Sequence, residues 1–314
     1  MIYVLLLILL FVLFTYLCYR KAYYSSPRRK EDPHHVSANE QYQQYKDQIL
    51  ALVDNICSYP FEQVYIKSDD ELELAGRYYH VHEGAPVLIM FHGYRSTAYR
   101  DCSGVFKLAM ELGYNMLIPD MRSHGLSQGK VITLGIRERY DCLRWVDYVS
   151  HRLGEETPII LAGCSMGAAT IMMSSELLPG QVKGLICDCG YSSIKGIMQD
   201  VSAKLHLLPG LTYFFLRLSA LVMGRFDPDS CSSLSSLSRS NVPILIIHGE
   251  DDRFVPCSMA HENYEASSSE VKMLLTVPGA GHGLSFLADE EGYRKAVLSF
   301  LEKLDLHSFS SAGS

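Results

Sequence analysis

Hydrophobic and polar positions change their pattern twice along this chain. The first 19 residues are apolar almost throughout, and the first charged side chain is Arg20. Residues 20–57 are polar and charged, and they predict a linker that leads into a short helix over 41–57. Beyond them, short apolar runs alternate with segments of helical spacing. This alternation predicts an α/β fold with a mostly parallel central sheet and helices on both faces.

The apolar runs predict eight strands. Two of them surround the turn Ser68-Asp69-Asp70 and predict a meander over 64–67 and 72–81. The other six are 86–91, 114–119, 158–162, 182–187, 242–247 and 271–277. The last three are continuous apolar runs, which is typical of strands buried on both faces. Helices are predicted over 98–112 and over 133–153, where Gly154 favours a C-terminal stop.

One insertion breaks the alternation, because residues 191–240 stand where a short helix would suffice. The stretch 207–223 is apolar on most faces, but Pro209, Gly210 and Arg217 interrupt it too often for a membrane span. We interpret 191–240 as a helical cap insertion over the edge of the sheet, with a Ser-rich return loop at 230–240. The cap could line a functional site or be an ordinary packed helix pair, and the sequence leaves both open.

These patterns divide the chain into six consecutive parts. They are a transmembrane anchor (1–19), a linker and leading helix (20–57), the first part of the core (58–190), the cap (191–240), the second part of the core (241–305) and a tail (306–314).

The N-terminal apolar run is about long enough for a helix to cross the hydrocarbon core of a membrane. A cleaved signal peptide is the alternative, but it would carry a basic start and small residues before the cut, which Thr15-Tyr16-Leu17-Cys18 does not offer. We therefore favour an uncleaved single-pass transmembrane helix. Basic residues follow it at Arg20, Lys21, Arg28, Arg29 and Lys30. The positive-inside rule then predicts that the rest of the chain lies in the cytoplasm, although the opposite insertion stays open.

Composition narrows the classes of partner. A net charge of -7 and a pI near 5.9 argue against a nucleic-acid partner. The nine cysteines are scattered, and Cys187-Asp188-Cys189 lacks the spacing of a zinc site. We expect buried free thiols, which favour a reducing compartment.

The pentapeptide Gly163-Cys164-Ser165-Met166-Gly167 lies between the predicted strand 158–162 and a helical segment. A serine on a sharp strand-to-helix turn exposes its hydroxyl, and flanking glycines avoid clashes with the neighbouring backbone. The alternative is a Gly-rich turn with a spare serine. The strand-turn-helix setting favours Ser165 as a nucleophile.

A nucleophilic serine needs a base and an acid that orients the base. Asp252 follows the strand 242–247, and His282 follows the strand 271–277. Because functional groups of open α/β sheets gather at the C-terminal ends of the strands, the three side chains are predicted to meet there. We predict the triad Ser165, Asp252 and His282, with Asp251 and Asp188 as alternative acids.

An oxyanion hole is predicted from two backbone N–H groups. Tyr94 follows the strand 86–91, and Met166 follows the nucleophile. Gly93 allows a close approach of the backbone, and His92 is interpreted as structural. This chemistry requires no metal and no organic cofactor.

From 64 to 304 the chain resembles the α/β-hydrolase superfamily, in particular the serine aminopeptidase-like and monoacylglycerol lipase-like hydrolases of the bacterial membrane-anchored type. The matching motifs are His92-Gly93, Asp120-Met121-Arg122-Ser123-His124-Gly125-Leu126-Ser127, the Ser165 pentapeptide, His248 to Pro256, and Gly281-His282. The family spacing over 248–256 selects Asp252 as the acid. The resemblance also implies that Asp120, Arg122 and His124 belong to the scaffold around the site.

The expected function is that of a serine hydrolase working through an acyl-enzyme. We expect a carboxylesterase or lipase-like esterase whose partner is a small-molecule ester or lipid-like substrate. One alternative, which the family resemblance suggests, is a serine aminopeptidase-like peptidase, but the cap offers only Asp200, Asp227 and Asp229 to bind an amino terminus. A catalytically inactive membrane-tethered binding protein is an alternative of another class, but no triad member is lost. The acyl length and the oligomeric state are left open.

Overall fold

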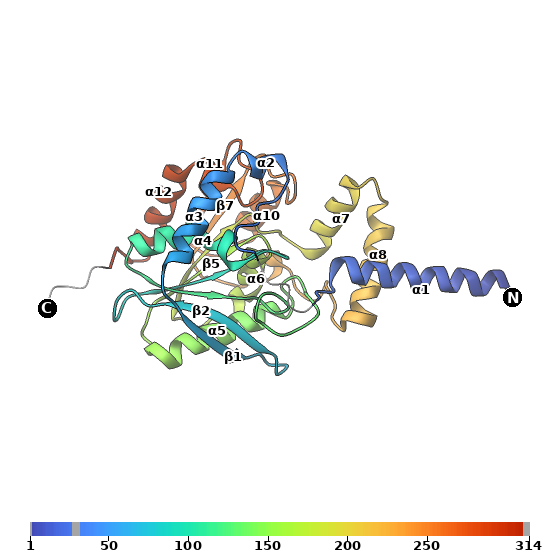
Figure 1. Ribbon diagram of the computed structural model, residues 1–314, viewed down its shortest axis with the longest axis horizontal. Coiled ribbons are helices and arrows are strands. Elements are labelled where there is room, and N and C mark those ends of the chain that lie inside the picture. The colour runs from blue at the N-terminus through green and yellow to red at the C-terminus, as the bar shows by residue number, and fades with distance from the viewer. Residues whose placement is uncertain (1, 27–31, 310–314) are drawn as a thin grey trace.

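The computed structural model describes residues 2–26 and 32–309 of the protein. Its centre is an eight-stranded sheet in the order β1-β2-β4-β3-β5-β6-β7-β8 (Figure 1). The strands are β1 (Glu62–Lys67), β2 (Glu73–Tyr79), β3 (Val87–Phe91), β4 (Asn115–Pro119), β5 (Ile159–Cys164), β6 (Val182–Asp188), β7 (Ile244–Gly249) and β8 (Lys272–Val277). Only β2 runs antiparallel to its neighbours β1 and β4, while the other neighbouring strands pair in parallel. The predicted mostly parallel sheet is confirmed.

One expectation about burial is wrong. The run at 271–277 was expected to be buried on both faces, but five of the six residues of β8 are only half-buried. The reason is its position, because β8 is the last strand of the sheet and has β7 as its only neighbouring strand.

The helices surround this sheet. They are α1 (Ile2–Ala22), α2 (Glu40–Gln43), α3 (Lys46–Ser58), α4 (Ala98–Glu111), α5 (Glu138–Leu153), α6 (Met166–Ser174), α7 (Ile194–Lys204), α8 (Pro209–Ser219), α9 (Ser233–Leu237), α10 (Ser258–Ala266), α11 (Ser285–Ala288) and α12 (Glu290–Glu302). A 3₁₀ turn at Ser175–Leu177 and a π-helical turn at Ala220–Gly224 complete the set. Two predicted helices differ from the observed ones. The helix expected over 41–57 is divided into α2 and α3, and the helix expected from Thr133 begins at Glu138.

The late start of α5 has a local cause. Leu134 and Gly135 have positive φ angles of 56° and 102°, which a continuing helix does not allow. The Glu138 carboxylate accepts hydrogen bonds from the backbone N–H groups of Thr133 (2.8 Å) and Gly135 (2.9 Å). Helical spacing before Glu138 therefore belongs to a turn that this carboxylate stabilises.

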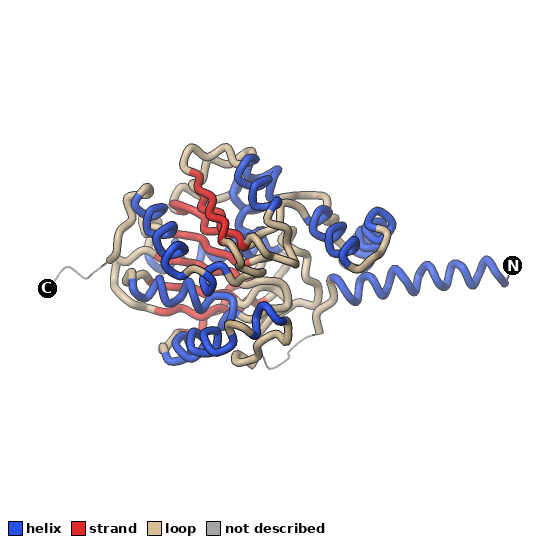
Figure 2. The backbone as a smooth tube through the Cα atoms, turned by 90° about the horizontal axis from the view of Figure 1, so that it is seen from above, coloured by secondary structure: helices blue, strands red, loops and turns tan. Residues whose placement is uncertain are grey.

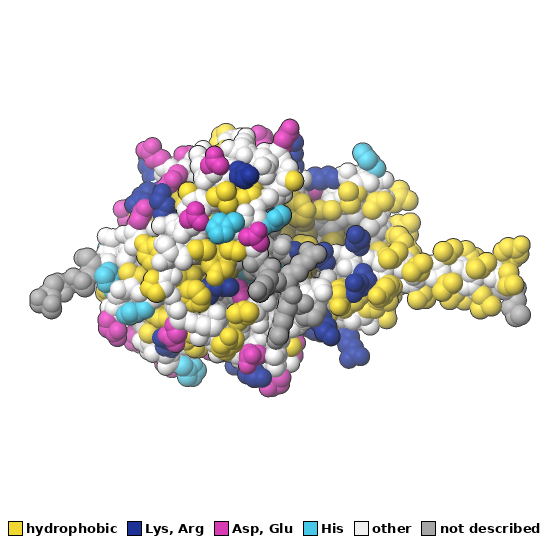
Figure 3. Space-filling view, viewed as in Figure 1, with side chains coloured by type: hydrophobic (Ala, Val, Ile, Leu, Met, Phe, Trp, Pro, Cys, Tyr) yellow, Lys and Arg dark blue, Asp and Glu magenta, His cyan; other side chains and the backbone are white. Residues whose placement is uncertain are grey.

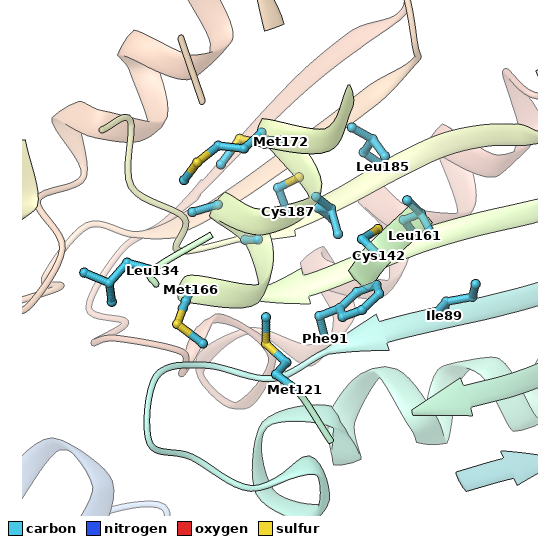
Figure 4. Close-up of a cluster of buried hydrophobic side chains, with 14 of the residues drawn as sticks. Ile89, Phe91, Met121, Leu134, Cys142, Leu161, Met166, Met172, Leu185 and Cys187 are labelled. Carbon is cyan, nitrogen blue, oxygen red and sulfur yellow. The ribbon is translucent and has the colours of Figure 1, made fainter. Parts of the chain in front are cut away.

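Helices cover both faces of the sheet, as predicted (Figure 2). Along β3, Val87, Ile89 and Phe91 face one hydrophobic cluster, whereas Leu88 and Met90 face the other. The first cluster includes apolar residues of α5 and α6, and the second includes residues of α4 and α12. Figure 4 shows part of the first cluster, where α6 side chains gather with side chains from the strands. Alternation along the strand thus fixes which face each helix covers.

The insertion after β6 contains α7 and α8, as a helical cap requires. Its Ser-rich end differs from the return loop expected at 230–240, because α9 forms there. Ser232 and Ser235 make a capping box at the start of α9. Ser233 and Ser236 are buried, and their hydroxyls donate to the backbone oxygens of Tyr191 (2.9 Å) and Met173 (3.1 Å). The serines therefore pack this segment against the core.

Helix α1 is the one helix in the described part of the chain that is long and apolar enough to cross a membrane. The segment after it, which we expected to be a linker, is packed at its beginning. Tyr23 is fully buried, and its backbone oxygen accepts a hydrogen bond from Ile132 N–H (2.8 Å). Ser25 N–H donates to Lys130 O (2.9 Å). The basic residues Arg28, Arg29 and Lys30 and the end of the tail (310–314) lie outside the described residues.

Candidate active site

Ser165 lies at the turn between β5 and α6. Its backbone angles are φ 54° and ψ −114°, a strained conformation for a residue with a side chain. A Cβ atom at Gly163 would lie 2.5 Å from Ala168 N, and one at Gly167 would lie 2.1 Å from Phe91 O. Both glycines are therefore required by the close approach of α6 to the strands, as the pentapeptide predicts.

The structure brings Ser165, His282 and Asp252 together from three strand ends. The Ser165 hydroxyl lies 2.9 Å from His282 Nε2. On the other side of the ring, Nδ1 lies 2.7 Å from Asp252 Oδ2. Because a carboxylate only accepts, Nδ1–H donates to Asp252, and in the neutral ring Nε2 is free to accept the Ser165 proton. This is the arrangement that serine activation needs.

The Asp252 carboxylate is held by more than the histidine. Its Oδ1 accepts hydrogen bonds from the backbone N–H groups of Phe254 (2.7 Å) and Val255 (2.9 Å). His248 Nε2 lies 3.3 Å from Oδ2. Burial alone would raise the pKa of Asp252, but its contacts with His248 and His282 outweigh burial and lower the pKa below its usual range. Asp252 is therefore ionised at neutral pH.

The two alternative acids occupy other environments. Asp251 is exposed. Asp188 is buried, and its Oδ1 accepts a hydrogen bond from the Ser285 hydroxyl at 3.1 Å. Burial raises the pKa of Asp188 to about 6. Of the three candidate carboxylates, Asp252 is the one that hydrogen-bonds to His282.

Both residues of the predicted oxyanion hole lie beside Ser165. A Cβ atom at Gly93 would lie only 3.3 Å from the Ser165 Cβ, so the backbone entering Tyr94 passes close to Ser165. Met166 is the first residue of α6, where backbone N–H groups favour negative charge. The side chain of Tyr94 has a second contact, since its hydroxyl donates to the backbone oxygens of Lys21 (3.2 Å) and Ala22 (2.9 Å) at the end of α1.

The residues interpreted as scaffold are buried and paired. Asp120 accepts a hydrogen bond from Arg77 Nη1 at 2.7 Å, and Arg122 makes two bonds of 2.6 Å to Asp141. The two histidines bind backbone groups: His92 Nε2 accepts from Met121 N–H (3.0 Å) and His124 Nε2 from Arg95 N–H (3.0 Å). These contacts hold the loops that leave β3 and β4.

Sequence reasoning missed the contribution of α2. The Tyr42 hydroxyl donates to the backbone oxygen of His282 at 2.7 Å, and Gln41 Nε2 donates to that of Asp251 at 3.1 Å. Helix α2 thus holds the two loops that carry His282 and Asp252. Phe254 was also missed, and its ring centroid lies 5.1 Å from that of His282. No local pattern reveals the contacts of α2, which join residues more than 200 positions apart in the sequence.

A cavity of about 210 Å³ opens beside Ser165 and His282. Much of its wall is apolar and comes from α3, α4 and the segment around α11, through Ile49, Leu52, Val105, Phe286 and Leu287. Arg100 and Asp101 also line it, paired at 3.2 Å. All of residues 191–240 are described, and none of them lines this cavity. The leading helices, rather than the cap, therefore form its wall.

One group of side chains in the described residues has donor atoms close enough for a metal ion: Cys189, Asp252 and His282, all within 4.8 Å. The donor set does not fit a metal, because Asp252 Oδ2 and His282 Nδ1 already bond to each other at 2.7 Å. Burial also raises the pKa of the Cys189 thiol well above its usual value, which disfavours the thiolate that a metal requires. We assign no metal role to this group.

A family model described as the alpha/beta hydrolase family matches residues 88–296. The chain belongs to this family. The matched region contains Ser165, Asp252, His282 and both predicted oxyanion residues.

Several curated proteins are similar to this hydrolase. The Bacillus subtilis protein YqkD, described as uncharacterized, is 27% identical over 72% of this chain and 75% of its own length. Human protein ABHD12B is 28% identical over 64% of this chain and 57% of its own. The zebrafish (Danio rerio) lysophosphatidylserine lipase ABHD12 is 26% identical over 67% of this chain and 53% of its own length. The hydrolase thus spans about half the length of the ABHD12 relatives it matches.

Solved structures support the same fold. A Pyrococcus furiosus esterase, Pf2001, superimposes with a TM-score of 0.65 at 22% identity, covering 79% of this chain and 94% of the esterase. The Butyrivibrio proteoclasticus protein Est1E with bound ferulic acid gives a TM-score of 0.60 at 22% identity, covering 77% of this chain and 99% of Est1E. At this identity the likeness concerns the fold of the hydrolase.

Proposed function

We propose that this protein is a serine hydrolase that cleaves carboxylic esters through an acyl-enzyme. The observation that carries the proposal is the continuous hydrogen-bonded chain from Ser165 to His282 to Asp252. His282 takes the Ser165 proton as the hydroxyl attacks the ester carbonyl, and ionised Asp252 stabilises the resulting imidazolium. The N–H groups of Tyr94 and Met166 hold the oxyanion. Water then releases the acyl group from Ser165.

The cavity supports an ester with a compact apolar acyl group. Its volume of about 210 Å³ exceeds that of a cavity of about 150 Å³ that accommodates benzene. We expect esters with an acyl chain of roughly four to six carbons to be hydrolysed faster than long-chain esters, because a longer chain would extend beyond this volume. The zebrafish lysophosphatidylserine lipase ABHD12 and the Pf2001 esterase are named for the same class of reaction, ester hydrolysis.

The peptidase alternative is less well supported. Recognition of a free amino terminus needs an unpaired carboxylate near the nucleophile. In the cap, Asp200 pairs with Lys204 at 2.6 Å, and Asp227 and Asp229 pair with Arg217 at 2.9 and 3.1 Å. Each acidic group of the cap therefore already has a basic partner within the cap, and Asp227 and Asp229 share one.

Fluorophosphonate labelling tests the nucleophile. The wild type should be labelled, and Ser165→Ala should lose both labelling and hydrolysis. Ser103→Ala is a matched control, because Ser103 lines the same cavity but donates its hydroxyl to Arg100 O at 3.0 Å. An unlabelled wild type, or equal labelling of Ser165→Ala, would contradict the proposal and favour an inactive binding protein.

A substrate panel tests the class of reaction. p-Nitrophenyl esters of increasing chain length are compared with aminoacyl anilides under one set of conditions. Ester hydrolysis with a maximum at short or medium chains is expected. Faster turnover of the anilides would favour the peptidase.

We also propose that α1 anchors the protein as a single-pass span with the hydrolase domain in the cytoplasm. Arg20 and Lys21 form the basic end of α1 on the side of the domain. A reporter enzyme fused to the C-terminus should be active only inside the cytoplasm. Activity only outside the cytoplasm would reverse the orientation.

A further inference from the structure

An apolar surface of the cap lies next to α1. We define this cap surface by its exposed apolar residues, which are Leu205, Leu207, Leu208, Leu211, Phe214, Leu221 and Val222. Phe214 and Leu208 are 54% and 70% exposed, although both side chains are large and apolar. Exposed apolar surfaces of this kind mark contacts with a partner or a membrane.

The position of this surface relative to α1 is fixed by ring contacts. Phe215 of α8 packs against Phe11 and Phe14 of α1, with centroid distances of 5.2 and 4.7 Å. Helix α8 runs across α1 rather than along it (Figures 1 and 2). Figure 3 shows hydrophobic side chains along α1 and on the adjoining cap. The two helices therefore present apolar side chains to the same surroundings.

The depth of these contacts follows from helix geometry. Arg20 is the first charged residue of α1 and belongs at the membrane–water interface. Phe14 and Phe11 precede it by six and nine residues, or about 9 and 14 Å at 1.5 Å per residue. A hydrocarbon core about 30 Å thick would therefore begin before the level of Phe215. If α1 spans the membrane, α8 cannot remain outside the lipid.

The charges of the cap fit this position. Arg217 is the one charged residue between Leu207 and Met223. Its guanidinium is paired with both Asp227 and Asp229. Tyr213 and Leu216, on the buried side of α8, face the protein instead. Helix α8 thus has one side packed on the domain and one open apolar side, and its only charged residue is paired with carboxylates.

We propose that the cap surface is embedded in the lipid bilayer, so that α8 lies in the membrane beside the part of α1 that contains Phe11 and Phe14. This inference goes beyond ester hydrolysis and rests on the proposed membrane anchor. The Tyr94 hydroxyl also donates hydrogen bonds to the backbone oxygens at the end of α1. These bonds fix the distance between the domain and the membrane that α1 would span. Both the cap and Tyr94 follow C-terminal ends of strands, which places the candidate site at the membrane-facing end of the sheet.

Tryptophan quenching tests the proposal in the full chain. The protein has a single tryptophan, Trp145, which is 1% exposed in the core and gives a constant background. Phe214→Trp and Leu208→Trp report on the cap surface, and Leu7→Trp reports on α1. Tyr65→Trp is a matched control, because Tyr65 is 51% exposed on the edge strand β1. Each variant is reconstituted in phosphatidylcholine vesicles with or without bromine atoms on the acyl chains.

We expect the brominated lipid to remove most of the emission that is added at positions 214, 208 and 7, and little of that at 65. Quenching at 7 but not at 214 or 208 would overturn the cap inference and leave the anchor intact. A blue-shifted, unquenched signal at 214 would also overturn it, since a second copy of the chain would then cover the surface. Lack of quenching at 7 would remove the anchor on which the inference rests. Melting curves of each variant verify folding, and no outcome depends on ester hydrolysis.

Discussion

Two buried carboxylates at the ends of neighbouring strands have opposite pKa shifts. Asp252 is surrounded by donors, and its pKa is lowered because these contacts outweigh burial. Asp188 accepts one hydroxyl bond from Ser285, and burial raises its pKa to about 6. The protein environment, rather than the residue type, therefore separates the ionised acid of the proposed triad from a carboxyl group that resists ionisation.

Substitution of each carboxylate by its amide separates the two roles. Asp252→Asn should lower kcat by about 10⁴-fold, because the amide can no longer hold His282 in the tautomer that accepts the Ser165 proton. Asp188→Asn should keep activity within about ten-fold of the wild type, since Asp188 makes no hydrogen bond to His282. Steady-state kinetics with a p-nitrophenyl ester measure both. A larger loss in Asp188→Asn would reassign the acid.

The raised pKa of Asp188 also predicts how stability depends on pH. A carboxyl group whose folded pKa of about 6 exceeds its unfolded value near 3.9 stabilises the fold at low pH, and this contribution is lost as the pH rises through 6. The loss is on the order of 3 kcal/mol at most, from a shift of about two units.

Asp188→Asn should therefore melt at a higher temperature than the wild type at pH 7.5, with a smaller difference at pH 4.5. The amide oxygen can still accept the Ser285 bond. Thermal unfolding followed by circular dichroism at both pH values checks this. An equal difference at the two pH values would mean that Asp188 titrates normally.

At the scale of elements, α2 shows how a short helix outside the family match contributes to the site. Tyr42 is a positioning residue, because its hydroxyl bonds to the backbone of His282 and not to the reacting atoms. Tyr42→Phe should lower kcat about two- to ten-fold, as the loss of one hydrogen bond of about 0.5–1.5 kcal/mol implies, with little change in KM. Gln43→Ala in the same helix is the control, because Gln43 bonds to Ser37 O, away from the site. An unchanged kcat in Tyr42→Phe would show that His282 needs no support from α2.

The junction of β5 and α6 depends on glycine for steric reasons. Gly167→Ala should prevent folding or destabilise the protein by more than about 3 kcal/mol, because its Cβ would lie 2.1 Å from Phe91 O. Gly210→Ala in α8 is the matched substitution, since nothing lies within 4 Å of the corresponding Cβ. It should stabilise the protein by about 0.5–1 kcal/mol through helix propensity. Urea unfolding of both variants gives the comparison, and similar values would contradict the steric explanation.

The elements also show where the sequence pattern is sufficient. Apolar runs predicted the strands to within a few residues, because burial between two helical layers requires continuous apolar side chains. The start of α5 was missed, since the Glu138 carboxylate stabilises a turn that helical spacing alone does not exclude. The helix α9 was missed for a related reason. Its serines are buried only because backbone oxygens of distant segments accept their hydroxyl protons.

At the scale of the whole molecule, the segment that directly follows α1 is packed into the domain. Tyr23 is fully buried, and its ring packs edge-on against Phe226 at 5.2 Å. A chain that begins at Cys18 keeps this contact, whereas one that begins at Ser26 loses it. The shorter chain should be less stable by on the order of 3 kcal/mol and melt roughly 5 °C lower. Calorimetry of both chains in the same detergent checks this, and equal melting temperatures would show that α1 ends in a loose linker.

The sequence by itself determined the order of strands and helices, the Gly-flanked turn at Ser165 and the placement of Asp252 and His282 after strands. These features follow from local periodicity and steric requirements, which depend only on residues close together in the sequence. Only the tertiary structure decided that α2 and α3 form part of the wall of the cavity and that α8 packs against α1. Those outcomes depend on distances between segments up to about 240 residues apart, and no local pattern encodes such distances.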